Sequence, residues 1–297
     1  MLIESLRHGE PMRRALAGLL ILSAAQALAV ESVDILGDDI QLSQPAQRII
    51  SLAPHITELL FAAGVGARIV GADAWSDYPP AARDIARIGD SSRIDLERVL
   101  ALKPDLVVAW DSGNPRADIA QLRRLGVPVF ISEPRHLQDI ADDLRKLGQL
   151  TGADASAETA ARAFEARVDT LRARYAEQRP LRVFYQISAQ PLMTVNGAHL
   201  ISALLELCGG RNIFAELAPL APAVSTEAVL GADPDVILAG TWPGEPDTAI
   251  DIWKRWPQLS AVRHGHLYTV PADELHRATP RLLDGAQKVC ALLQQAR

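Results

Sequence analysis

Short apolar runs alternate with segments of helical periodicity along most of this chain, and this alternation limits the possible folds more than any other feature. In the first half it predicts strands at 48–53, 67–71, 105–110 and 127–132 and helices at 56–63, 96–102, 115–125 and 137–150. In the second half it predicts strands at 182–187, 235–239 and 267–270 and a helix at 199–207. Such alternation with short links indicates βαβ units around mainly parallel sheets. The sequence therefore predicts an α/β fold.

A long helix separates the two alternating regions. Residues 155–178 are rich in Ala, Arg and Glu and carry apolar side chains at spacings of three or four, namely Ala160, Phe164, Val168, Leu171 and Tyr175. We expect two Rossmann-like lobes joined by this one helix. The predicted division is a signal peptide at 1–29, an N-terminal lobe at 30–150, an inter-lobe helix at 151–180 and a C-terminal lobe at 181–297. A single helical tether predicts limited hinge motion and a largely pre-formed cleft.

The two lobes share a short internal repeat. ERVLALKPDLVV at 97–108 resembles EAVLGADPDVIL at 227–238, and both have the pattern of a helix, a Pro-Asp turn and a strand. In each copy a good N-cap residue, Asp95 or Ser225, lies two positions before the glutamate. Glu97 and Glu227 are therefore predicted in the first turn of equivalent helices.

The first 29 residues have the pattern of a secretory signal peptide. A basic start at 12–14 precedes an apolar run at 15–25, and the small residues Ala27 and Ala29 fit cleavage after Ala29. The run is shorter than the roughly 18 to 20 apolar residues that a membrane span needs. We expect an exported protein. Cys208 and Cys290 would then lie in an oxidising compartment, where they form a disulfide or remain as two buried thiols.

Charge and missing motifs argue against several functions. The net charge of −6 over 297 residues is unlike that of a nucleic-acid-binding protein. The sequence contains no phosphate-binding GxxxxGK[ST] loop, no GxGxxG after a strand, and neither GxSxG nor HExxH. No catalytic residue, catalytic cofactor or metal centre is predicted. His55 and His199 open helices near strand ends, and they are either metal ligands or ordinary part-buried histidines, of which the second is commoner.

Five segments resemble the periplasmic vitamin B12-binding proteins. They are RIISLAPHITELLFAAG at 48–64, SDYPP at 76–80, LER at 96–98, ALKPDLVVAW at 101–110 and LCGGRNIF at 207–214. The resemblance implies two α/β lobes with a rigid connecting helix and a periplasmic location. It also implies cobalamin, a corrinoid, as a ligand held between the lobes. The protein is then expected to be a monomer that delivers this ligand to the membrane permease of a B12 ABC importer.

The resemblance places ligand contacts on both lobes. In the N-terminal lobe the contact falls on Trp75, which alternatively covers the core of its own lobe. In the C-terminal lobe it falls on the predicted loop Asp273, Glu274, Leu275, His276 and Arg277. Asp273 or Arg277 alternatively forms a structural ion pair, and His276 is either a polar contact or an axial ligand to cobalt or haem iron.

The resemblance also assigns two surface residues and the cysteines. Glu97 and Glu227 match glutamates with which the family docks on permease arginines, although a carboxylate in a first helical turn also stabilises the helix without a partner. Cys208 and Cys290 match the family's disulfide within the second lobe. Two other functions stay open: binding of haem or a ferric siderophore on the same fold, and an exported enzyme whose site assembles only in three dimensions.

Overall fold

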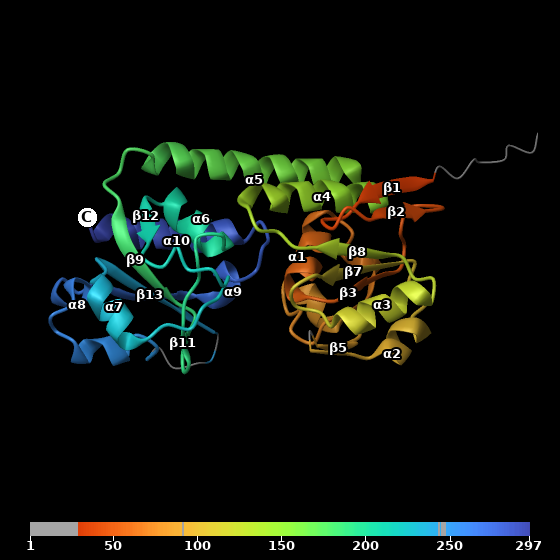
Figure 1. Cartoon of the computed structure of the whole chain (residues 1–297). Coiled ribbons are helices and arrows are strands. Elements are labelled where there is room, and N and C mark those ends of the chain that lie inside the picture. Colours follow the sequence, from red (N-terminus) through yellow and green to blue (C-terminus); the bar gives the residue numbers. More distant parts are fainter. Residues whose placement is uncertain (1–28, 91, 243, 245–247) are drawn as a thin grey trace, which may run out of the picture.

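The computed structural model describes residues 29–297, except for 91, 243 and 245–247. Apart from Ala29, the predicted signal peptide at 1–29 lies outside these residues. Within the described part of the chain, no helix combines the length and the apolar character that a bilayer crossing requires. The described residues form two lobes, each built around its own sheet (Figure 1).

The N-terminal lobe has a four-stranded parallel sheet in the order β4-β3-β7-β8. Its elements are, in chain order, β1 (Val30–Val33), β2 (Asp39–Leu42), β3 (Ile49–Ser51), α1 (Pro54–Ala62), β4 (Ile69–Ala72), β5 (Gly89–Asp90), β6 (Arg93–Ile94), α2 (Leu96–Ala101), β7 (Leu106–Trp110), α3 (Arg116–Arg124), β8 (Val129–Ser132) and α4 (Leu137–Thr151). Helix α1 begins with Pro54, whose missing N–H and fixed φ suit a first helical position. All eight elements predicted in this half are present.

The C-terminal lobe also has a four-stranded parallel sheet, in the order β12-β9-β13-β14. Its elements are β9 (Leu181–Gln186), β10 (Ser188–Ala189), β11 (Leu192–Met193), α6 (Leu200–Leu207), β12 (Gly210–Asn212), α7 (Thr226–Ala232), β13 (Val236–Thr241), α8 (Ser260–Arg263), β14 (Leu267–Pro271), α9 (Ala272–Leu275) and α10 (Leu282–Gln295). The predicted strands and helix are again present. The segment expected as a loop at 273–277 differs, because most of it forms the short helix α9.

The two sheets have the same strand order when the strands of each are numbered along the chain, namely 2-1-3-4. The repeat also uses the same turn. Lys103 and Asp233 both adopt positive φ, 48° and 41°, directly before the repeated Pro-Asp pair. The aspartates that follow, Asp105 and Asp235, accept hydrogen bonds from the backbone N–H groups of Arg48 and Arg182, each 2.8 Å long, at the start of the first strand. The two halves are therefore built on one plan.

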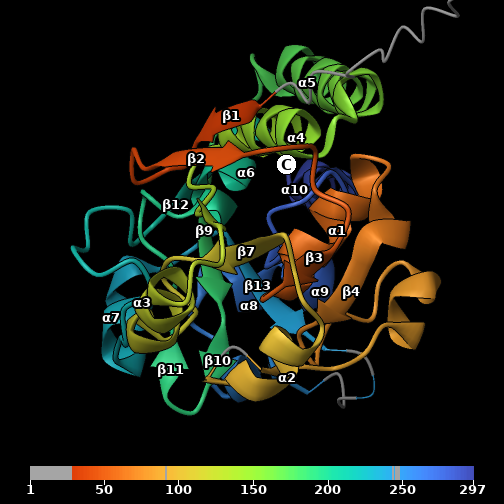
Figure 2. The same ribbon diagram turned by 90° about the vertical axis from the view of Figure 1, so that its right-hand side faces the viewer.

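Helix α5 (Asp154–Tyr175) lies across both lobes, with α4 alongside it in the N-terminal half (Figure 1). The turned view in Figure 2 shows the same pair above the two sheets. The apolar positions Phe164, Val168, Leu171 and Tyr175 are buried, and they belong to one core that includes side chains from both lobes. Because this core is continuous along α5, the helix is a packed bridge and not an exposed linker.

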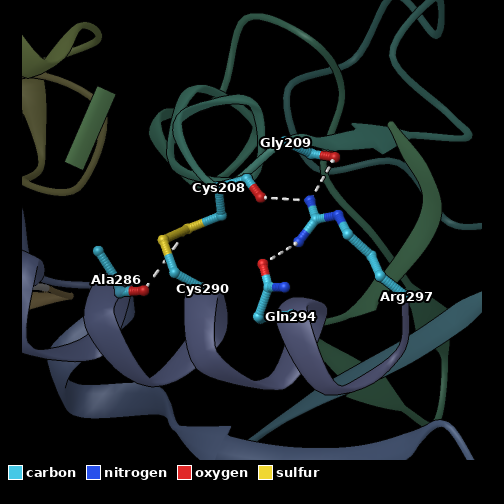
Figure 3. Close-up of a disulfide and its surroundings, with 6 residues drawn as sticks. All are labelled: Cys208, Gly209, Ala286, Cys290, Gln294 and Arg297. Carbon is cyan, nitrogen blue, oxygen red and sulfur yellow. Dashed lines mark hydrogen bonds between the residues drawn. A yellow bond between two sulfur atoms is a disulfide. The ribbon is translucent and has the colours of Figure 1, made fainter. Parts of the chain in front are cut away.

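The disulfide joins the end of α6 to α10 within the C-terminal lobe (Figure 3). Cys208 and Cys290 are both fully buried and lie 82 residues apart in the sequence. Beside the bridge, the Arg297 guanidinium donates to the carbonyl oxygens of Cys208 (2.8 Å) and Gly209 (3.2 Å), where α6 has ended (Figure 3). The predicted disulfide is confirmed.

Candidate functional site

In the N-terminal lobe, the strand order reverses between β3 and β7, and open α/β sheets bind ligands at this kind of switch point, beyond the carboxyl ends of the strands. The segment after β3 places His55 at the start of α1, and β7 ends at Trp110. The two rings meet edge to face with centroids 5.3 Å apart. His55 is buried, and its Nε2 has no hydrogen-bond partner in the described structure.

In the C-terminal lobe, the equivalent reversal lies between β9 and β13. Tyr185 near the end of β9 is fully buried, and its hydroxyl lies 2.8 Å from His276 Nε2. Trp242 follows β13, is 41% exposed, and meets the His276 ring edge to face at 5.6 Å. Each lobe thus presents aromatic and imidazole rings at its strand ends.

A cavity of 100 Å³ lies between these two walls. Its lining is His55, Trp110, Ser112, Glu133, Pro134 and Arg135 from the N-terminal lobe, and Ala198, His199, Leu200, Leu220, Leu275, His276 and Ala278 from the C-terminal lobe. This volume has room for about three water molecules, whereas sites for drug-sized ligands span about 300 to 1,000 Å³. The space between these two walls is therefore smaller than the expected pre-formed cleft, and a large ligand would enter it only if the lobes separate.

Three histidines of the cavity have lowered pKa values. Burial lowers the pKa of His55 to about 4, with a smaller contribution from the charge of Arg277. Burial likewise lowers the pKa of His199 and of His276 to about 4, and His199 adds to the effect on His276. The imidazoles are neutral at pH 7, and His199 uses Nδ1 to accept the Ile201 N–H at 3.1 Å, which caps α6. The described residues contain no group of three or more His, Cys, Asp or Glu that could hold a metal ion.

Leu275 and His276 are the two predicted ligand contacts that line the cavity. His276 is already bonded to Tyr185 through Nε2, which is the atom an axial ligand would often use. Trp75 lies outside the lining and is 69% exposed, which contradicts the alternative that it covers the core of its lobe.

The predicted contacts Asp273, Glu274 and Arg277 form ion pairs. Glu274 pairs with Lys288 on α10 at 2.7 Å, and Asp273 accepts from Arg281 Nη1 at 2.9 Å. Arg277 is 9% exposed and donates to two carboxylates of the other lobe. Asp273 and Arg277 thus form the structural ion pairs that are the alternative to ligand contact. Each of these side chains becomes available to a ligand only if it exchanges partners.

Comparison with known proteins shows the family. Residues 49–274 match the family described as periplasmic binding protein. The chain belongs to the periplasmic binding protein family. It is 41% identical to the vitamin B12-binding protein of Vibrio cholerae over 85% of this chain and 91% of that protein. It is 42% identical to the protein of the same name from Yersinia pestis over 84% of this chain and 86% of that protein.

Similar solved structures confirm the predicted fold class. The crystal structure of the periplasmic vitamin B12 binding protein BtuF of Vibrio cholerae superposes with a TM-score of 0.79, at 41% identity, over 85% of this chain and 98% of that chain. The haem-binding protein HmuT is 24% identical and superposes with a TM-score of 0.75 over 91% of each chain, which shows a shared fold alone.

The two predicted docking glutamates occupy equivalent surface positions in this family member. Asp95 caps α2 by accepting the Arg98 N–H at 3.0 Å, and Ser225 caps α7 by accepting the Ala228 N–H at 3.1 Å. Glu97 and Glu227 follow in the first turns and are exposed. Each lobe of the binding protein therefore presents one carboxylate at the start of a matching helix.

Most of the aromatic and histidine residues at the strand ends are not predicted as site residues from the sequence. No sequence pattern singles out Trp110, Tyr185 or Trp242 as a site residue, and for His55 and His199 two interpretations stay open. A signal is nevertheless present for four of these five. Trp110 ends the predicted strand at 105–110, Tyr185 lies two residues before the end of the one at 182–187, Trp242 lies three residues after the one at 235–239, and His55 lies two residues after the one at 48–53.

Proposed function

We propose that this chain captures vitamin B12 or a related corrinoid between its two lobes in the periplasm and delivers it to the permease of an ABC importer. The observation that carries the proposal is the identity of 41% and 42%, over 84% or more of the chain, to proteins named for vitamin B12 binding. In this proposal the protein is a monomer that binds without transforming its ligand, and it has no catalytic cofactor. Its units are the lobes at 30–150 and 181–297 and the helix at 151–180.

The chemistry of the two walls supports a large, mainly apolar ligand with polar edges. Trp75 offers an exposed indole, and large aromatic side chains bury about 150 to 250 Å² each. The neutral His276, together with the main chain and side chains of 273–277, offers hydrogen bonds for the amide groups around a corrin ring. In this proposal the lobes open, the ligand enters the 100 Å³ gap, and Asp273 and Arg277 exchange part of their ion pairs for ligand contacts.

Calorimetric titration of the purified chain with cyanocobalamin and, separately, with haemin tests the ligand. We expect a single site for cyanocobalamin and weaker or no specific heat for haemin. Burial raises the pKa of Tyr185 above its usual range, so this phenol resists the ionisation that a tyrosinate ligand to haem iron needs. Saturable haemin binding without cyanocobalamin binding would replace the proposal with haem capture.

The docking part of the proposal assigns Glu97 and Glu227 to arginines of the permease, since charge pairs across an interface set register and partner choice. Reversing both charges, Glu97→Lys with Glu227→Lys, should abolish ligand-stimulated ATP hydrolysis by the importer and leave corrinoid affinity unchanged. The matched control is Glu31→Lys with Glu177→Lys, which changes the charge equally at two other exposed glutamates. Equal loss in both double variants would refute the assignment.

A further inference from the structure

One carboxylate of the N-terminal lobe is held entirely by the C-terminal lobe. Glu58 on α1 is 5% exposed, and both of its oxygens accept hydrogen bonds from residues 277–281. Oε1 accepts from Arg277 Nη1 (3.0 Å) and Arg281 Nη2 (2.8 Å). Oε2 accepts from Thr279 Oγ1 (3.0 Å) and Arg281 Nε (3.1 Å). The Arg281 contact is bidentate, the geometry that adds direction as well as energy to an ion pair.

The same arginines reach the proposed ligand contacts. Arg277 Nη1 also donates to Asp77 Oδ1 at 2.8 Å, and Arg277 Nη2 to the Trp75 carbonyl oxygen at 3.4 Å. Arg281 donates to Asp273 at 2.9 Å, and its guanidinium lies 4.1 Å from the centre of a tyrosine ring of the N-terminal lobe. Glu58 is therefore the acceptor that Arg277 and Arg281 share, and these two arginines in turn contact Trp75 and Asp273.

The position of Glu58 gives these contacts a mechanical meaning. Helix α5 already fastens the lobes together through its buried side, and the Arg167 to Asp284 pair (2.6 Å) adds a contact between α5 and α10. The Glu58 contacts join α1 directly to residues 277–281, so they form a second attachment between the lobes that does not pass through α5. A second attachment reduces the relative movements that a single one allows.

We propose that Glu58 is a positioning residue that forms, with Arg277, Thr279 and Arg281, a second attachment between the lobes and so restrains how they move relative to each other. The inference rests on the proposed function, since it concerns how the two ligand-contacting walls keep their register. Buried ion pairs are often retained for the arrangement they specify and less for net stability. Pre-set register lowers the cost of ordering both walls when a ligand binds.

The test compares Glu58→Gln with a matched control, Glu165→Gln. Glu165 makes a similar bidentate pair with Arg145 (2.8 and 2.9 Å), but that pair joins α4 to α5 and does not cross between the lobes. Spin labels carried by unnatural amino acids at two exposed alanines, Ala120 on α3 and Ala228 on α7, leave the disulfide intact. Pulsed electron resonance then gives the distribution of inter-lobe distances without ligand.

We expect Glu58→Gln to broaden the distance distribution, because contacts that restrain the two lobes are lost. Glu165→Gln should leave the distribution unchanged. An unaltered distribution in a folded Glu58→Gln protein would overturn the inference. If Glu58→Gln does not fold, Arg281→Lys replaces it: this variant keeps the charge and loses the bidentate geometry, so it must broaden the distribution or the inference fails. Failure of the unmodified chain to bind cyanocobalamin would reject the proposed ligand while the distance measurement still decides the role of Glu58.

Discussion

The two lobes have the same sheet and are stabilised by different means. Both use the strand order 2-1-3-4 and the same turn with a left-handed residue before Pro-Asp. The C-terminal lobe has a disulfide between α6 and α10. This bridge uses both cysteines of the sequence, so the N-terminal lobe has no disulfide. The N-terminal lobe instead adds the β1-β2 hairpin, which packs against α4. The shared topology thus fixes where the strands end. The stability of each lobe depends on features that the two lobes do not share.

The largest expected difference comes from the disulfide. Replacing Cys208 and Cys290 by alanine releases an 82-residue constraint in the unfolded chain. The chain-entropy relation gives a loss of about 4.5 kcal/mol in the free energy of unfolding of the C-terminal lobe. Hydrogen–deuterium exchange of the variant should show faster exchange in β9, β13 and α10 and unchanged exchange in β3 and β7. Equal acceleration in both lobes would mean that they unfold as one unit and would remove this contrast.

The next largest difference between the lobes is expected in their stability at acidic pH. Each of His199 and His276 in the C-terminal lobe has a pKa lowered to about 4, so the unfolded chain binds more protons than the folded chain between about pH 6.5 and 4. The free energy of unfolding therefore decreases as the pH falls through that window. From pH 7 to 5 the loss is about 2 kcal/mol for each histidine. His55 acts in the same direction in the N-terminal lobe.

Two aspartates oppose that loss in the N-terminal lobe. Burial raises the pKa of Asp73 and of Asp143 to about 6, so the folded state binds more protons below pH 6 and gains about 1 kcal/mol for each carboxyl by pH 5. Hydrogen–deuterium exchange measured at pH 7 and pH 5, and corrected for the intrinsic exchange rate, should therefore become faster at pH 5 in the C-terminal lobe alone. Asp143→Asn should make the N-terminal lobe acid-sensitive as well, and equal sensitivity of both lobes in the unmodified chain would contradict these shifts.

The smallest expected difference lies in the repeated turn. Lys103→Gly relieves the left-handed backbone at φ 48° and should raise the free energy of unfolding by about 0.5 kcal/mol. Asp233→Gly relieves a similar strain but loses hydrogen bonds from the Ser260 N–H (2.7 Å) and hydroxyl (2.8 Å), so it should cost about 1 kcal/mol. Urea unfolding of the two variants measures both. Effects of the same sign in both variants would contradict the predicted difference between the two turns.

The sequence predicts seven of the eight strands of the two main sheets, because these strands are apolar and regularly spaced by helices, but it does not predict the short edge strand β12. It also does not predict β1 and β2, which are strands of only four residues with alternating burial at the start of the N-terminal lobe. The inter-lobe contacts were also missed, since no periodicity links Glu58 with residues more than 200 positions away. One signal was available: Glu58 is the single charged residue within the apolar helix α1, and a buried acid needs a partner.

The small gap between the walls has a kinetic consequence. In the proposed function, a corrinoid is too large for the 100 Å³ gap, so its capture would follow the parting of the lobes. When a closed form predominates and only a minor form accepts ligand, the observed association rate rises with ligand concentration and then levels off at the rate of opening. At high ligand concentration, the opening of the lobes would then limit the rate of ligand capture. A further increase in ligand concentration would not raise that rate.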